Sequence, residues 1–381
     1  MTKSAHGAGS LASAWRAIHD GELADAYAGA VALVARGEEV LLHRATGLAV
    51  RESARIPMTE ETIFDIASLT KVVATLPAIL RLIDAGLVGL DEPVGAYLTE
   101  FSVEGWKRGV TVRRLLSHSA GFPAWRPLYV DGAGPASYLA TISAVEPAYE
   151  PGTESVYSDF GFILLGELVR RVTGKDIAVF AVREVFAPLG MTETMFSPPA
   201  GLRDRIAAAE VGNLYERGMA AERAAEFGGW REELIWGEVH DGNAFYGLGG
   251  VAGHAGLFGT GRDLLRYGQC WLNGGVVNGD RLLSEKIVAE ATKEQAPGRG
   301  LGWRLPTDDP EDHGRPLGPR AFGHTGFSGA SLWIDPDRDL VIVLLTNRVH
   351  PTVREGIGAA RLAFNTALAD EFPIGRSEES A

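Results

Sequence analysis

Strand-like sequence lies towards both ends of this chain, and helix-like sequence fills the middle. Residues 30–35 and 40–43 alternate at period two around a turn and predict a β-hairpin. Residues 321–334 and 340–346 have the buried, β-rich character of a second hairpin. Residues 72–240 carry mostly the apolar spacing of helices. We therefore predict an α/β (α+β) fold: an antiparallel sheet formed from both chain ends, flanked by helices, with an all-helical domain inserted.

The same pattern predicts the domain boundaries. An α/β sheet domain would comprise residues 1–70 and 241–374, and the inserted, mainly helical domain would comprise residues 71–240. The polar segment 375–381 reads as a disordered tail. A chain of 381 residues with 46% hydrophobic content is long enough to bury a core of this size.

Ser68 and Lys71 stand three residues apart at the predicted start of a helix. Residues three apart share one side of a helix, so the lysine nitrogen can reach the serine hydroxyl and draw off its proton. Unpaired N–H groups at a helix start also favour the negative charge of a tetrahedral oxyanion. A capping serine beside a solvated lysine would give the same pattern, so partners elsewhere in the chain must decide.

Tyr157 lies just before a helix predicted from Asp159 onwards. A tyrosine at a helix entry can project into a cleft, and a nearby lysine ammonium would lower the pKa of its phenol. Tyr157 could then act as general base for Ser68 and as acid for the leaving group. Taken alone, it fits a packing residue with one hydrogen bond better.

Three glycines fall within residues 323–329 of the predicted strand. Because glycine weakens a strand, their density indicates that another group approaches the backbone closely, as a substrate lying along the strand edge would. His324 and Thr325 would present donors to a substrate carbonyl or carboxylate, and the N–H after Gly326 could stabilise an oxyanion. A glycine-rich bulge with a solvated histidine is the alternative.

These three motifs, in this order, resemble those of serine β-lactamases and penicillin-recognising enzymes. The resemblance is greatest to the branch of class C β-lactamases, D,D-peptidases and family VIII esterases, where the motifs are Ser-x-x-Lys, Tyr-x-Asn and Lys- or His-x-Gly. It covers roughly residues 25–370. The segments that also resemble this branch are 64–67, 90–94, 115–121, 188–191, and 256–258 leading to Asp263.

The resemblance implies roles for the motif residues. Ser68 would be acylated, Lys71 and Tyr157 would shuttle its proton, and the backbone N–H groups of Ser68 and Phe327 would form the oxyanion hole. The resemblance also implies a set of substrate-binding residues: Asp159, His324, Thr325, Gly326 and Phe327.

Two residues depart from the motifs of true class C β-lactamases. Asp159 stands where asparagine is usual, and it could hold Lys71 as ammonium, shift the role of base to Tyr157 and disfavour a substrate carboxylate nearby. His324 replaces lysine, as in the D,D-peptidase, D-aminopeptidase and esterase members. An unperturbed histidine titrates at about pH 6.5, so we predict activity that changes between about pH 6 and 7.

Composition narrows the partners. A net charge of −13 and the lack of a Lys/Arg cluster along the sequence argue against nucleic acid. Cys270 is the single cysteine, and His240, Asp241 and His254 match no zinc signature, so we expect neither a metal nor an organic cofactor. The first residues lack the features of an export signal and no apolar run is long enough to span a membrane, which predicts a cytoplasmic protein. A small-molecule substrate is the expected partner, and the oligomeric state stays open.

We therefore predict a serine hydrolase that cleaves an amide or ester bond through an acyl-enzyme on Ser68. A small ester or D-amino-acid peptide is the first choice of substrate, because of His324, Asp159 and the missing export signal. A class C-type β-lactamase is the second. A non-catalytic penicillin-like ligand-binding or assembly protein is the alternative from another class, although Ser68, Lys71 and Tyr157 are costly to bury without use. Several aromatic residues either form an acyl-binding wall or pack the domain interface: Trp125, Trp230, Trp236, Phe245 and Tyr246.

Overall fold

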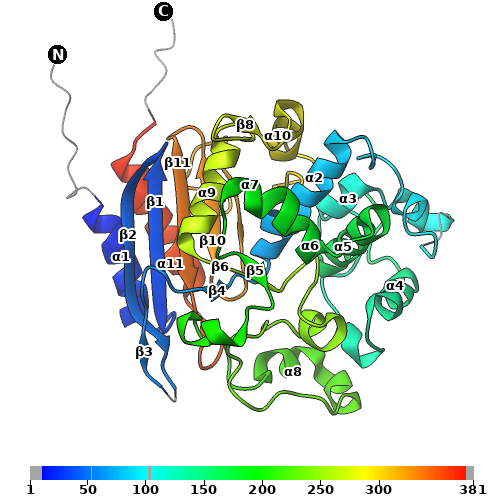
Figure 1. The fold of residues 1–381 in the computed structure, drawn as a ribbon, viewed down its shortest axis with the longest axis horizontal. Helices are drawn as coiled ribbons and strands as arrows, with labels where there is room; N and C mark the ends of the chain where they lie inside the picture. The colour runs from blue at the N-terminus through cyan, green and yellow to red at the C-terminus, as the bar shows by residue number, and fades with distance from the viewer. Residues whose placement is uncertain (1–10, 53, 102–103, 375–381) are drawn as a thin grey trace, which may run out of the picture.

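The computed structural model describes residues 11–52, 54–101 and 104–374, and its largest sheet is antiparallel with the strand order β3-β2-β1-β11-β10-β9 (Figure 1). Strands from the two ends of the chain meet where β1 pairs with β11. The fold class predicted from the sequence is thus confirmed. The strands of this sheet are β1 (Gly29–Arg36), β2 (Glu39–Val50), β3 (Ile56–Pro57), β9 (Phe322–Thr325), β10 (Ser331–Asp335) and β11 (Leu340–Thr346).

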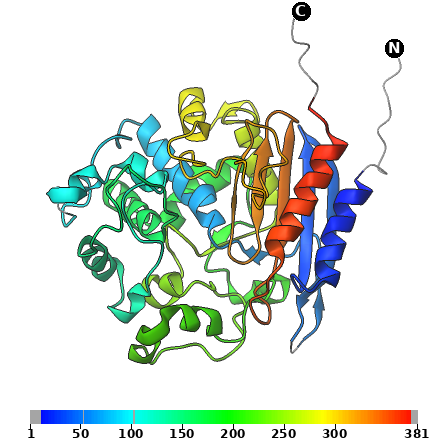
Figure 2. The same ribbon diagram turned by 180° about the vertical axis from the view of Figure 1, so that it is seen from behind.

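Both faces of the sheet are covered by other elements, so its central strands are buried on both sides. Alternate residues of β1 belong to two different hydrophobic clusters: Ala30, Ala32 and Val34 to one, and Val31 and Leu33 to the other. Helices α1 (Ala12–Leu23) and α11 (Ile357–Glu371) lie side by side on the first face, as Figure 2 shows. Helix α9 (Gly261–Leu272) packs on β1, β10 and β11 from the second face.

The remaining helices gather on the far side of α9 from α1 and α11 (Figure 1). They are α2 (Leu76–Asp84), preceded by a π-helical turn at Lys71–Thr75, then α3 (Val112–Leu116), α4 (Pro135–Ser143), α5 (Asp159–Thr173), α6 (Ile177–Ala181), α7 (Ala187–Leu189), α8 (Leu214–Ala220) and α10 (Glu285–Thr292). Two small sheets complete the fold: β4 (Phe64–Asp65), β6 (Leu257–Gly259) and β5 (Met195–Phe196), and the pair β7 (Val276–Val277) and β8 (Asp280–Arg281). Within the described ranges, no helix has the length and apolar character needed to cross a membrane.

The division into residues 1–70 with 241–374 and residues 71–240 stays a prediction, which we retain as a proposal. The proposed tail 375–381 and the first residues of the chain lie outside the described residues.

The strand expected over residues 321–334 is in fact two strands, β9 and β10, joined by a tight turn. The Gly326 N–H donates to the Ala330 carbonyl oxygen at 2.7 Å and closes the turn. Gly329 has a φ of 105°, which side chains rarely allow, so glycine is required at this point. The turn places Phe327 at the end of β9, beside the residues of the third motif.

Candidate active site

Strand β4 leads the chain to Ser68 through a constrained turn. The Asp65 carboxylate accepts hydrogen bonds from the N–H groups of Ala67 and His240, both at 2.8 Å, and so fixes this turn from inside. Ala67 has a φ of 47°, in the left-handed region that residues other than glycine seldom adopt. Such strain is held in place only by surrounding contacts and recurs at functional sites. The chain then enters helical structure, as predicted, with Ser68 at its start.

The Lys71 ammonium lies at the centre of the site and is completely buried. Its Nζ donates to Ser68 Oγ at 2.9 Å and to the His254 carbonyl oxygen at 3.1 Å, and it lies 2.7 Å from Asp159 Oδ1. Burial would lower the pKa of Lys71, but Asp159 and then Tyr157 raise it above its ordinary value. Lys71 therefore holds its proton at neutral pH and acts on Ser68 as a hydrogen-bond donor.

Tyr157 stands one residue before Ser158, the N-cap of α5, which directs its ring into the site. The ring lies over the Lys71 ammonium, with Nζ 4.9 Å from its centre, and between two imidazoles. The ring centre of His118 is 4.5 Å away, and that of His324 is 5.7 Å away. Burial raises the pKa of the Tyr157 phenol, while Lys71 acts to lower it. The three residues predicted to be catalytic are thus brought together.

His118 is a neighbour that sequence reasoning missed. Its Nδ1 accepts a hydrogen bond from the Ser158 N–H at 3.1 Å, and its ring contacts the Tyr157 ring at a tilt of 40°. Burial, followed by Arg299 and Lys71, holds the pKa of His118 well below its ordinary value. A neutral imidazole therefore supports the tyrosine. The segment 115–121, which contains His118, shows a family resemblance, but its residue pattern does not indicate this contact.

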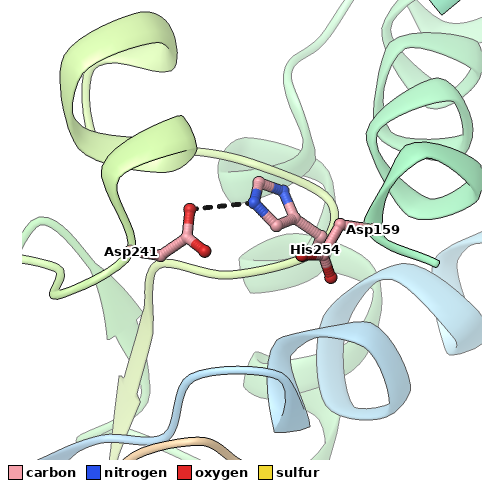
Figure 3. Close-up of side chains that lie close together, drawn as sticks. All are labelled: Asp159, Asp241 and His254. Carbon is pink, nitrogen blue, oxygen red and sulfur yellow. Dashed lines mark hydrogen bonds and ion pairs between the residues drawn. The ribbon is translucent and has the colours of Figure 1, made fainter. Parts of the chain in front are cut away.

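Asp241 and His254 lie beside Asp159, as Figure 3 shows. Each of the three offers an oxygen or nitrogen atom within 4.8 Å of the other two, a spacing that could suit a metal ion. However, His254 Nε2 and Asp241 Oδ1 are already joined at 3.0 Å, and the Lys71 ammonium pairs with Asp159. The pKa of Asp241, which burial would raise, is lowered to about 2 mainly by His254. We interpret the group as a charge network around Lys71, and the expected absence of a metal stays a prediction.

The N–H groups predicted to form the oxyanion hole are available. Among the described residues, neither the Ser68 nor the Phe327 backbone N–H has a hydrogen-bond partner. Both residues line the space around the Ser68 hydroxyl. Two free N–H donors beside a nucleophile are the arrangement that stabilises a tetrahedral oxyanion.

The glycines of the third motif make room for other parts of the protein, whereas we expected them to make room for a substrate. A Cβ on Gly323 would lie 2.4 Å from the Trp333 indole, and one on Gly326 would lie 2.4 Å from the Ile66 carbonyl oxygen. The groups that approach this backbone therefore belong to the protein, not to a substrate along the strand edge. Gly326 lets β9 pack directly against the segment that leads to Ser68.

The expectation that His324 titrates near pH 6–7 is wrong for this environment. His324 is buried, and its Nδ1 lies 2.7 Å from the Thr325 carbonyl oxygen, so Nδ1 carries the proton. Burial, followed by Arg299 and Lys71, holds the pKa of His324 well below its ordinary value. Its Nε2 has no partner among the described residues and is left as an acceptor. His324 is a neutral imidazole at physiological pH.

We expect the ratio of kcat/KM between wild type and His324→Gln to stay constant from pH 6 to pH 8. A histidine that is neutral throughout this range cannot introduce an ionisation, and glutamine preserves a polar side chain of similar reach. Initial rates of ester hydrolysis at half-unit pH intervals would measure the ratio. An inflection near pH 6.5 that is present in wild type and absent from the variant would contradict a buried, neutral His324.

Two cavities meet at Ser68, Tyr157 and Phe327, which line both. One, the aromatic cavity, has a volume of about 210 Å³; its other lining residues include Trp125, Asp159, Tyr215, Glu216, Met219, His240 and Asp241. The other, the arginine cavity, has a volume of about 370 Å³; its other lining residues are Arg299, Arg304, His324, Thr325, Gly326, Arg348, Ile357 and Arg361. The nucleophile thus lies between an acidic, aromatic space and a basic one.

The aromatic residues singled out in the sequence divide between the two roles considered. Trp125 lines the aromatic cavity. Trp230 and Tyr246 instead pack against each other and Tyr129, and the remaining two, Trp236 and Phe245, pack against a separate hydrophobic cluster. Glu216, which sequence reasoning missed, enters the aromatic cavity from α8. Burial, followed by Asp241, raises its pKa to about 8.

Comparison with known proteins places this geometry in context. The family model described as "Beta-lactamase" matches residues 16–366. A protein of Escherichia coli O157:H7 named "Putative D-alanyl-D-alanine carboxypeptidase" is 33% identical over 357 residues, which cover 86% of this chain and 80% of that protein. The solved structure of a penicillin-binding protein homologue from Caulobacter crescentus has a TM-score of 0.73 at 24% identity, covering 95% of this chain and 98% of that one. A family VIII carboxylesterase has a TM-score of 0.69 at 25% identity, covering 95% and 98%.

Proposed function

The chain belongs to the β-lactamase family and is a serine hydrolase, and on that premise we propose that it cleaves a D-amino-acid peptide or a small ester through an acyl-enzyme on Ser68. The observation that carries the proposal is the position of the Lys71 ammonium, 2.9 Å from Ser68 Oγ and 2.7 Å from Asp159 Oδ1. A buried charge pair beside a serine that follows a strained residue, Ala67, is costly to keep without use. The relative named for carboxypeptidase activity and the carboxylesterase neighbour support the two substrate classes.

Tyr157 acts as base in its ionised form. In acylation, Ser68 Oγ attacks the carbonyl carbon of the substrate while its proton passes to the Tyr157 phenolate oxygen. Lys71 stays an ammonium and stabilises the Tyr157 phenolate before the transfer and the negative charge that develops on Ser68 Oγ during it. The N–H groups of Ser68 and Phe327 would bind the carbonyl oxygen as it becomes an oxyanion. The C–N or C–O bond then breaks, and the leaving atom takes the proton back from Tyr157.

Deacylation reverses these roles. A water molecule attacks the acyl-enzyme, Tyr157 takes its proton, and Ser68 Oγ regains a proton as the acid product leaves. Asp159 lines only the aromatic cavity, so a substrate carboxylate is repelled there and favoured in the arginine cavity. For a carboxypeptidase substrate, whose carboxylate belongs to the leaving amino acid, we assign the acyl group to the aromatic cavity and the leaving group to the arginine cavity.

The test combines intact-protein mass spectrometry with turnover assays. The protein is incubated with a fluorophosphonate and with a penicillin, and hydrolysis of p-nitrophenyl butyrate and of N-acetyl-D-alanyl-D-alanine is followed in parallel. We expect one fluorophosphonate adduct per chain, turnover of the ester or peptide, and a penicilloyl adduct that persists for minutes. Rapid penicillin hydrolysis without an adduct would indicate a β-lactamase instead. No adduct with either reagent and no turnover would indicate a non-catalytic binding protein.

A further inference from the structure

Four arginines surround the arginine cavity, although the chain as a whole has a net charge of −13. They are Arg299, Arg304, Arg348 and Arg361. Asp312, 3.0 Å from Arg304, is the only carboxylate within 4.0 Å of any of them in the part of the chain that the structure describes. Three guanidinium groups therefore lack an acidic partner. Desolvated cations without counter-ions are unfavourable, so this arrangement calls for an anion from outside the chain.

Arg361 is the clearest case, because it is 7% exposed and lies on helix α11 beneath the turn that follows β9. Its Nη2 donates to the carbonyl oxygens of Gly326 at 3.1 Å and Ala330 at 2.7 Å, and its Nε has no partner among the described residues. Burial, followed by Arg348 and Arg304, lowers its pKa to about 9. The neighbouring cations thus repel one another, and a bound anion would offset both the burial and the repulsion.

The arginines fall into two pairs by the part of the chain that supplies them. A backbone bridge joins Arg299 to Arg304. A second bridge joins Arg304 to Gly323 at the outer edge of β9. The Arg299 guanidinium lies 5.4 Å from the centre of the Tyr157 ring. This first pair therefore lies against the general base and the edge of the sheet.

The second pair, Arg348 and Arg361, holds the turn that contains Phe327. Arg348 Nε donates to the Phe327 carbonyl oxygen at 2.6 Å, and its guanidinium lies 4.4 Å from the centre of the Phe327 ring. A guanidinium binds a carboxylate through two parallel hydrogen bonds. Four guanidinium groups in one cavity offer more donors than a single carboxylate can use, so they suit a ligand with two carboxylates.

We propose that the arginine cavity binds a leaving group with two negative charges, and that the substrate is the amide of an acidic amino acid whose two carboxylates meet the two arginine pairs. This inference rests on the proposed function, which assigns the leaving group to this cavity. Ser68 Oγ bonds to the acyl carbon, the amide C–N bond breaks, and the departing nitrogen takes the proton that Ser68 lost. The dicarboxylic amino acid leaves as a free amine, and water releases the acyl group.

The experiment compares kcat/KM for three peptides that share one acyl group: N-acetyl-D-alanyl-D-alanine, -D-glutamine and -D-glutamate. Glutamine matches glutamate in shape and lacks only its second charge. We expect the wild type to prefer D-glutamate over D-glutamine by about tenfold or more, the factor that about 1.4 kcal/mol supplies. Arg299→Gln and Arg348→Gln, one from each pair, should each reduce this ratio towards one. Arg320→Gln, which removes an arginine with a 69% exposed side chain, should leave it unchanged.

Parallel assays separate the failure of this inference from failure of the proposed function. Equal kcat/KM for D-glutamate and D-glutamine, with p-nitrophenyl butyrate still hydrolysed by the wild type, overturns the dianionic leaving group alone. Inhibition by inorganic phosphate that is stronger than inhibition by D-glutamate overturns the dicarboxylate in favour of a phosphorylated leaving group. If the wild type shows neither fluorophosphonate labelling nor turnover of any of these substrates, the proposed function is refuted instead. If Arg348→Gln does not fold, Arg299→Gln decides the outcome, because among the described residues the Arg299 guanidinium makes no hydrogen bond to the backbone.

Discussion

Replacing Ser68 with alanine should lower kcat for p-nitrophenyl butyrate by about 10⁴-fold or more, because no other group can form the acyl-enzyme. The remaining rate would come from binding and from the N–H groups of the oxyanion hole. The fold should tolerate the change. Lys71 loses its 2.9 Å hydrogen bond to the serine but keeps Asp159 and the His254 carbonyl oxygen. The free energy of unfolding should therefore change by no more than about 1 kcal/mol.

Three measurements check this prediction on one pair of proteins. Initial rates give kcat, mass spectrometry gives fluorophosphonate labelling, and urea unfolding gives stability. Ser143→Ala is the matched control, since Ser143 lies at the end of α4. Among the described residues, its hydroxyl bonds only to the Ala140 carbonyl oxygen in its own helix. Labelling of Ser68→Ala at the wild-type rate would show that another residue is the nucleophile.

The sequence was sufficient to predict the nucleophile and its partners because each stands where one type of local structure begins. Ser68 begins a helix with a clear apolar period, and Tyr157 precedes the N-cap Ser158 of α5. In both cases, the local pattern fixes the direction of the side chain. Fixing the distance between the two residues required the family resemblance, since the two segments are separated by nearly ninety positions.

The arginine cavity could not be predicted in this way. Its arginines come from a backbone bridge at Arg299 and Arg304, from the turn after β11, and from helix α11, so no spacing in the sequence relates them. No basic cluster that would oppose the net charge of −13 is visible along the sequence. The fold nevertheless brings four arginines together in one cavity. Likewise, β9 and β10 were predicted as one strand because residues on both sides of the turn at Gly326 have a buried, β-rich character.

The protonation of the site depends on the charge balance around Lys71, and Asp159 sets that balance. With the ammonium and the carboxylate 2.7 Å apart, each charge offsets part of the effect of the other on Tyr157. The phenol of Tyr157 then has little reason to ionise: burial raises its pKa, Lys71 acts to lower it, and Asp159 adds to the increase. Tyr157 can act as base only after its phenol has lost a proton, and the pKa of that phenol is raised. We therefore expect kcat/KM to rise with pH through the neutral range.

Asp159→Asn should move the rising limb of the pH profile of kcat/KM to lower pH by at least about one unit, and so raise activity at pH 7 about tenfold. Asparagine removes the carboxylate that favours the neutral phenol, which leaves the Lys71 charge uncompensated beside Tyr157. The pKa values of both residues then fall, and the pair titrates together. Rates from pH 5.5 to pH 9.5 with an uncharged ester, whose own charge stays constant, would measure the shift.

The same variant should be less stable, by about 3 kcal/mol at pH 7, because it leaves a buried ammonium without its partner. In the wild type, the folded-state pKa of Lys71 lies above its ordinary 10.5, so its contribution is fully present below pH 10.5 and is lost only as pH rises through that higher value. In Asp159→Asn, the folded-state pKa lies below the unfolded one, the unfolded chain binds more protons, and stability rises with pH. Urea unfolding at pH 7 and pH 9 would show the new slope.

Two further variants test whether Tyr157 is the group that titrates and whether the effect is specific to Asp159. Tyr157→Phe should remove the rising limb along with most of the activity, because the titrating group is gone. Asp91→Asn makes the same chemical change at an ion pair with Arg113, where the aspartate side chain is 72% exposed, and should leave the profile unchanged. If the limb of Asp159→Asn coincides with that of wild type, the group that titrates does not feel the Asp159 charge. Tyr157 would then not be the base, and the proton of Ser68 would have to pass to another acceptor.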